Sequence, residues 1–133
     1  MEDHTLKIIP LIALALLLSA CGAKDISTLK KNPAIHGAVT VHGDYQDVYA
    51  RVRAKVLECG NPGQYPSPMF EDKARRLIEV PIGNVNGMAL YYSVQGNENG
   101  TSTVDVYSHF NVGNWPEIVG MITRGASGQC GCP

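Results

Sequence analysis

The sequence of 133 residues lacks the patterns that would assign it to a familiar functional class. It has no Gly-x-Ser-x-Gly, His-Glu-x-x-His, phosphate-loop or dinucleotide motif, so the classes that these motifs define have no support. Acidic and basic residues nearly balance, at 12 and 11, which removes the basic footprint of a nucleic-acid partner. The longest apolar stretch, residues 8–18, is shorter than the roughly 20 residues that a membrane-spanning helix needs.

That short apolar stretch ends at a cysteine with small neighbours. Leu18-Ser19-Ala20 precede Cys21, and Gly22 follows it. A thiol that is to be acylated must reach membrane-embedded enzymes, so it lies directly behind a short hydrophobic segment. The first 22 residues therefore resemble a bacterial lipoprotein signal peptide with its lipobox. The resemblance implies cleavage before Cys21, acylation of Cys21 and anchoring to the membrane by lipid.

The residues after the cysteine bear on the expected location. In this family an aspartate directly after the cysteine marks retention in the inner membrane, whereas this chain has Gly22 and Ala23. The resemblance therefore implies lipid anchoring to the outer membrane of the cell envelope, on its periplasmic side or at the surface. Each buried acyl methylene contributes roughly 0.8 kcal/mol, so two or more chains make a stable anchor.

The length of the mature chain indicates a single domain. Removal of residues 1–20 leaves 113 residues, enough for one modest hydrophobic core. Residues 21–36 contain no sustained periodicity, and we interpret them as the lipidated N-terminus and a tether. Residues 37–133 are then expected to form one α+β domain with a cysteine-containing C-terminal tail.

Three cysteines remain after Cys21 is assigned to lipid. An exported protein enters an oxidising compartment, so at least one disulfide is expected. Cys130 and Cys132 are separated by a single residue and would bridge each other only with strain, which favours a long-range bond from Cys59. We expect Cys59 to pair with Cys130, with Cys132 as the alternative partner. Closing a loop of about 70 residues would stabilise the domain by about 4 kcal/mol.

Hydrophobic periodicity predicts the regular elements. Apolar residues alternate with polar ones over residues 38–42, 76–82, 88–95 and 101–110, which indicates four strands. Between the first two, apolar residues recur every three or four positions over residues 45–59, behind a capping Asp44, which indicates a helix. A second helix is expected over residues 114–124, with Gly125 as its stop.

The order of these elements, βαβββα, predicts the fold class. We expect an α+β domain with a small antiparallel sheet of about four strands, two helices on one face, and the other face exposed or partnered. In this order the chain loosely resembles small periplasmic α+β lipoprotein domains. No residue role follows from that second resemblance, because it includes no motif.

One loop adds a possible binding surface. Residues 61–72 contain three prolines and no periodicity, and their large apolar side chains are Tyr65, Met69 and Phe70. Exposed, these side chains would form an adhesive patch, whereas folded back they would cover the edge of the core.

Histidines and cysteines are the remaining candidates for chemistry. Antiparallel pairing could bring His42 or His109 close to Asp105 as an acid-base set, with His36 as a further candidate. Thiolates of Cys130 and Cys132 with a histidine would suit zinc or copper.

The sequence nevertheless favours a non-enzymatic role. We expect a binding or structural module without a cofactor, which engages another envelope component and no nucleic acid. A small secreted hydrolase or a metal-handling lipoprotein is the alternative. Aromatic side chains give large contact area at low entropic cost, so the expected contacts are Tyr65, Phe70, Tyr91 and Tyr107.

Overall fold

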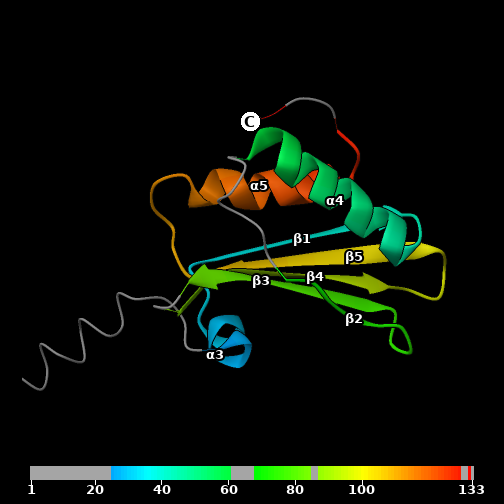
Figure 1. Cartoon of the computed structure of the whole chain (residues 1–133), viewed down its shortest axis with the longest axis horizontal. Coiled ribbons are helices and arrows are strands. Elements are labelled where there is room, and N and C mark those ends of the chain that lie inside the picture. Colours follow the sequence, from blue (N-terminus) through cyan, green and yellow to red (C-terminus); the bar gives the residue numbers. More distant parts are fainter. Residues whose placement is uncertain (1–24, 61–67, 85–86, 130–131, 133) are drawn as a thin grey trace, which may run out of the picture.

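The computed structural model of the chain describes residues 25–60, 68–84, 87–129 and 132 (Figure 1). The α+β class predicted from the order of elements is confirmed. The described residues contain one more strand and one more helix than the sequence predicted. In chain order the elements are α3 (Ile26–Lys31), β1 (Ile35–His42), α4 (Tyr45–Cys59), β2 (Phe70–Asp72), β3 (Leu77–Asn84), β4 (Gly87–Gly96), β5 (Thr101–Ser108) and α5 (Trp115–Ala126).

The strands form one antiparallel sheet in the order β1-β5-β4-β3-β2. Three consecutive strands, β3 to β5, make a meander, and β1 pairs with β5 from the N-terminal part of the sequence. Val104 of β5 lies opposite both Val39 of β1 and Val94 of β4, whose next partner is Ile78 of β3. Directly opposed residues share a face of the sheet, so this apolar row lies on one side.

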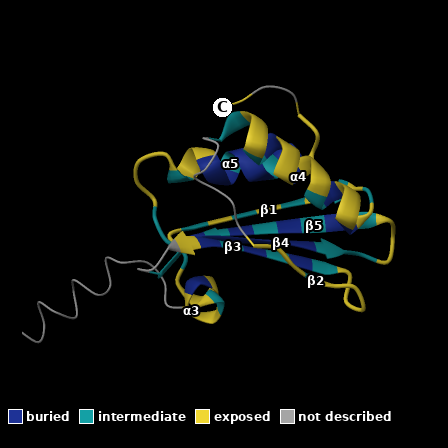
Figure 2. Ribbon diagram, viewed as in Figure 1, coloured by how far each residue is buried: buried dark blue, intermediate teal, exposed yellow. Residues whose placement is uncertain are grey.

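Helices α4 and α5 cover that side and enclose the main core (Figure 2). Asp44 caps α4, because its side chain accepts a hydrogen bond from the Gln46 backbone N–H at 3.1 Å. The predicted apolar stripe of α4 faces inward, and both Val48 and Val52 are fully buried. Ile122 of α5 is fully buried as well. The core is therefore a helix layer packed on one face of the sheet.

Gly125 lies inside α5 and does not end it. The helix continues to Ala126, and Gly125 is buried against α4. A Cβ atom at Gly125 would lie 2.8 Å from the Cβ atom of Lys55, closer than two such carbons can approach. The missing side chain therefore lets the two helices pack closely. The left-handed residue that follows the helix is Gly128, with φ +74°.

Helix α3 packs on the opposite face of the sheet, in a segment that the sequence predicted to be a tether. Asp25 caps this helix and accepts a hydrogen bond from the Thr28 backbone N–H at 2.7 Å. Leu29 is 1% exposed and packs with Tyr91 in a second, smaller cluster. The folded part of the chain therefore begins before residue 37.

Strand β2 is the additional strand, and it lies in the segment predicted to be a loop. It is only three residues long and pairs with β3 alone, at the edge of the sheet. Glu71 of this strand points toward the helix side, where it accepts hydrogen bonds from the Tyr45 hydroxyl and the Gln46 side-chain amide, each at 2.7 Å. Both donors belong to the first turn of α4, so β2 is held to the helix layer.

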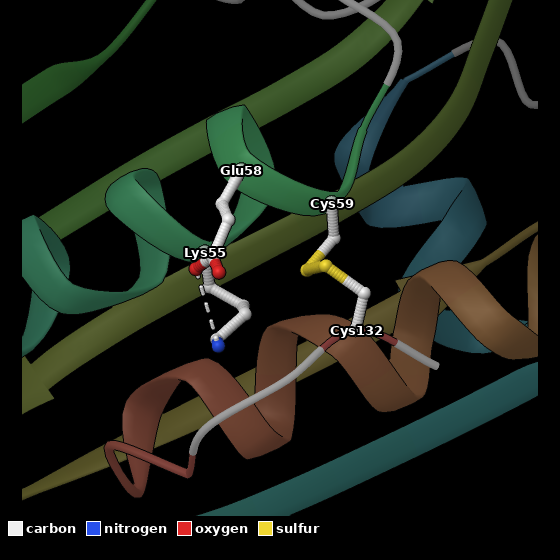
Figure 3. The surroundings of a disulfide bond; sticks show 4 residues. All are labelled: Lys55, Glu58, Cys59 and Cys132. Carbon is white, nitrogen blue, oxygen red and sulfur yellow. Dashed lines mark hydrogen bonds and ion pairs between the residues drawn. A yellow bond between two sulfur atoms is a disulfide. The ribbon is translucent and has the colours of Figure 1, made fainter.

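A disulfide joins the end of α4 to the C-terminal tail (Figure 3). Cys59 pairs with Cys132, and their Cα atoms are 5.3 Å apart. The predicted long-range bond from Cys59 is therefore present, but its partner is the alternative residue. The favoured partner, Cys130, lies outside the described residues. Gly125 packs beside Lys55, about one helical turn before Cys59, so the tail after α5 has only a short distance to cover.

Candidate binding surface on the open face of the sheet

The face of the sheet opposite α4 and α5, here called the open face, carries most of the described candidate residues. The register places His36, Tyr107 and Tyr91 in one row across β1, β5 and β4. The next row contains Ala38, Asp105, Ser93, Glu79 and Phe70. Figure 1 shows α3 lying against only part of this face, so the open face has a covered and an uncovered part.

Tyr91 and Tyr107 lie beneath α3, and Tyr107 is in turn joined to His36 and Asp105, whose side chains remain partly exposed. His36 Nε2 lies 3.0 Å from Asp105 Oδ1, and the imidazole stacks on the Tyr107 ring at a centroid distance of 4.3 Å. Tyr91 donates its hydroxyl to Glu79 Oε2 at 2.5 Å. The ammonium group of Lys30, on α3, lies 5.0 Å from the centre of the Tyr91 ring on β4, which is within cation–π range. Lys30, together with the packing of Leu29 and Ile26, holds α3 against the sheet.

Both tyrosines of this cluster remain protonated near neutral pH. Burial is the main reason why the pKa of Tyr91 rises far above its ordinary value of 10, and the hydrogen bond to the Glu79 carboxylate raises it further. Burial also raises the pKa of Tyr107, and the negative charge of Asp105 adds to the effect. The two phenols therefore act as hydrogen-bonding and packing groups, and neither is a base.

Of the histidines considered as acid-base partners of Asp105, the structure brings His36 to it. His42 lies opposite Thr101, four residues along β5 from Asp105, which corresponds to roughly 13 Å. His109 follows Asp105 by four residues in the other direction. The histidine that contacts Asp105 is instead His36, which no spacing rule had favoured over the other two. His36 could have been identified only from the register of β1 against β5, which the sequence alone does not fix.

The His36–Asp105 pair does not have the arrangement of a nucleophilic triad with the neighbouring serine. Ser93 lies opposite Asp105 on β4, whereas His36 lies on β1, on the other side of Asp105. A triad needs the histidine between the carboxylate and the nucleophile, because the imidazole takes the proton from the attacking hydroxyl. Here the carboxylate takes the middle position. The imidazole of the pair stacks on Tyr107 and so helps to orient that ring.

The predicted thiolate metal site is not available at Cys132. Its sulfur is bonded to that of Cys59, and a disulfide sulfur is not a thiolate ligand. Over residues 25–60, 68–84, 87–129 and 132, no group of three histidine, cysteine or acidic side chains lies close enough to hold a metal ion. In the same ranges no helix has the length and apolar character to cross a bilayer.

The uncovered part of the open face is a mainly polar surface with the exposed Phe70 at one edge. Thr40 and Thr103 form a hydrogen bond across β1 and β5 at 3.1 Å, and Asn97 donates to Thr103 at 3.0 Å. Phe70 of β2 is 58% exposed at the edge of this surface, and the preceding Met69 is 40% exposed. These hydrogen bonds order the β1–β5 side of the surface, whereas Phe70 lies on the opposite edge strand, beside Glu79, which Tyr91 holds by a hydrogen bond.

The four expected aromatic contacts differ in availability. Tyr91 is 1% exposed because α3 covers it, and Tyr107 is half-buried beneath Lys30. Phe70 is exposed, as one of the two interpretations of its segment predicted. Tyr65 and the lipobox residue Cys21 lie outside the described residues.

The geometry defines an α+β domain with one helix-covered face and one partly open face. Neither a scan against models of known protein families nor a search of curated proteins finds a significant match to this chain. Its function must therefore be argued from its own residues.

Proposed function

We propose that the protein is a lipid-anchored module of the bacterial cell envelope, without catalytic activity, that binds another envelope protein through the uncovered part of its open face. The lipobox at Cys21 supports the anchor. The exposure of Phe70, opposite a Glu79 carboxylate that Tyr91 holds by a hydrogen bond, supports the binding role and is the observation on which it rests. A large exposed aromatic group with fixed surroundings is typical of an interaction site.

The surroundings of Phe70 indicate the chemistry of the partner. Phe70 lies directly opposite Glu79, and Asp72 lies opposite Leu77 in the next row of the same face. The Glu79 carboxylate accepts a hydrogen bond from the Tyr91 hydroxyl, and this bond holds the carboxylate in place beside the phenyl ring of Phe70. A fitting partner would offer an apolar pocket for Phe70 with a hydrogen-bond donor or a cation at its rim.

Site-specific photo-crosslinking in the native envelope tests this proposal. A photoreactive phenylalanine analogue replaces Phe70 in one variant and Leu57 in a matched control. Leu57 is 56% exposed but lies on α4, on the other side of the molecule. We expect a discrete crosslinked protein band from position 70 that is absent from position 57. The intact mass of the extracted protein, read from the same samples, should equal residues 21–133 plus acyl chains.

Two results would contradict the proposal, and they concern different parts of it. Equal or absent crosslinking at positions 70 and 57 would remove the binding role of the open face. A mass without acyl chains would remove the lipid anchor.

A further inference from the structure

Helix α3 sets how far the domain can lie from a lipidated Cys21. The helix is held to the sheet by Leu29, and its cap residue Asp25 follows Cys21 by four residues. An extended chain spans at most about 3.6 Å per residue, so these four residues reach roughly 14 Å. The domain is thus confined close to the bilayer, whereas a tether that continued to residue 36 would allow several times that distance.

The short reach places one end of the sheet nearest the membrane. Ala34, which follows α3, donates its backbone N–H to Ser108 O at 2.8 Å, and His109 donates to Ala89 O at 2.8 Å. The start of β1 and the end of β5 therefore lie at the same end of the sheet. Figure 1 shows α3 and the segment between β5 and α5 at this end as well. We call α3 and residues 109–115 together the anchor-proximal end.

The anchor-proximal end has an apolar tip. Val112 is 69% exposed, the highest value among the exposed large hydrophobic residues of the described chain. Behind it the rings of Phe110 and Trp115 stack at a centroid distance of 5.8 Å, and both are half-buried. Nothing in the fold requires an exposed valine at this turn.

The charges around this tip suit a phospholipid surface. Lys30 and Lys31 of α3 are exposed, and the acidic residues that adjoin this end in sequence are Asp25, before α3, and Glu117, after residue 115. Asp25 caps α3 with its carboxylate, which leaves Glu117 in the first turn of α5 as the acidic group nearest the tip in sequence. An aromatic side chain beside an apolar tip, with lysines on α3 at the same end of the sheet but on its opposite face, is a composition that suits the interfacial region of a bilayer.

We infer that the anchor-proximal end rests on the bilayer that holds the lipid anchor, with Val112 inserted among the acyl chains and Trp115 at the level of the headgroups. This inference depends on the proposed acylation of Cys21. The partner that covers the apolar tip is then the lipid surface itself. Phe70 pairs with Glu79, near the end of β3 that lies away from the β3–β4 turn, so the binding surface lies toward the end of the sheet farther from the membrane.

Tryptophan fluorescence tests the inference in the full-length lipidated protein. The chain has a single tryptophan, Trp115, so a reporter can be moved without interference. One variant combines Val112→Trp with Trp115→Phe, and the matched control combines Leu57→Trp with Trp115→Phe. Each is extracted from membranes and reconstituted into vesicles of phosphatidylethanolamine and phosphatidylglycerol, with and without brominated acyl chains.

The expected result is a difference between the two reporters on the same vesicles. Brominated chains should reduce the emission at position 112 by roughly half, because an interfacial apolar group enters the acyl boundary by about 5–10 Å. The emission at position 57 should not change. Equal quenching at both positions, in protein that co-sediments with the vesicles, would overturn the inference and leave the anchor intact. Protein that fails to co-sediment would overturn both.

Discussion

Tyr91 and Tyr92 are neighbours on β4, and they are buried on opposite faces of the sheet. Tyr92 is 4% exposed and belongs to the main core beneath α4 and α5, as its place in the alternating pattern predicted. Tyr91 points to the open face, where the pattern predicted contact with a partner, and it is 1% exposed because α3 covers it. The same residue type is therefore buried for two reasons, and only one of them is visible in the alternation.

The buried tyrosines should make the fold sensitive to alkaline pH. Burial is the main cause that raises the pKa of Tyr92 above its ordinary value of 10. The unfolded chain then loses this proton at lower pH than the folded chain does. The free energy of unfolding is therefore unaffected below pH 10 and falls as the pH rises above it, by at most about 1.4 kcal/mol per pH unit for each such group.

Urea denaturation of wild type and Tyr92→Phe at about pH 8 and about pH 11, with free thiols alkylated, checks this expectation. Phenylalanine fills nearly the same volume and has no proton to lose, so the variant should lose less stability between the two pH values. Parallel losses in both proteins would mean that Tyr92 ionises as easily in the folded state as in the unfolded chain.

At the level of elements, α3 owes its structure to the sheet. A helix of six residues is not stable alone, because too few hydrogen bonds offset the cost of nucleation. Leu29 and Ile26 pack in the cluster around Tyr91, and Lys30 lies over the rings of Tyr91 and Tyr107. The docking of α3 is therefore a tertiary interaction, and it is the one that shortens the tether.

Leu29→Ala should detach α3 without unfolding the domain. The side chain is almost fully buried, so its truncation removes most of the apolar contact between α3 and the sheet. We expect a loss of about 2 kcal/mol, at the low end for a buried leucine, since the helix can leave while the main core stays packed. Hydrogen exchange should become faster in α3 and remain slow in β4. Lys31→Ala, at an exposed position of the same helix, is the control and should leave exchange unchanged.

Persistent protection of α3 in Leu29→Ala would contradict this account. It would mean that the cation–π contacts and the Asp25 cap hold the helix by themselves, and that the inferred position of the anchor does not depend on apolar packing.

The sequence predicted the long elements better than the short ones. The helix over residues 45–59 and the three strands of the meander were found to within two residues or so, because each has enough length to show its period. Helix α3 has one fully buried residue, and β2 has three residues in all, so neither shows a period. A glycine after an apolar helical pattern predicts a helix stop, and that prediction was wrong for Gly125. The role of Gly125 is its close contact with Lys55, which depends on how the two helices pack and so is not visible in the sequence.

For the whole molecule, the Cys59–Cys132 disulfide links the end of α4 to the C-terminal tail across 73 residues of sequence. The enclosed chain includes the meander and α5, so the bond restricts most of the unfolded domain. Chain entropy then predicts a stabilisation of about 4 kcal/mol, as an upper value. A small domain with one modest core is the kind of fold in which such a bond matters.

Replacement of Cys132 by alanine should lower the melting temperature of the oxidised protein, whereas replacement of Cys130 should not. The physical reason is that only the first change opens the loop closed through Cys59. Thermal unfolding with and without a reductant measures both effects, and reduction should bring wild type to the level of Cys132→Ala. A destabilised Cys130→Ala protein would show that this residue, which the sequence favoured, is the partner in solution.

By itself the sequence determined the α+β class, the meander, the helix behind Asp44 and the existence of a long-range disulfide. These follow from local periodicity, capping and the spacing of the cysteines, which a single chain displays along its length. The tertiary structure decided which cysteine pairs with Cys59, which histidine meets Asp105, and that α3 covers Tyr91. Those outcomes depend on the register of distant strands and on the packing of short segments against them, and neither quantity is encoded in the spacing of neighbouring residues.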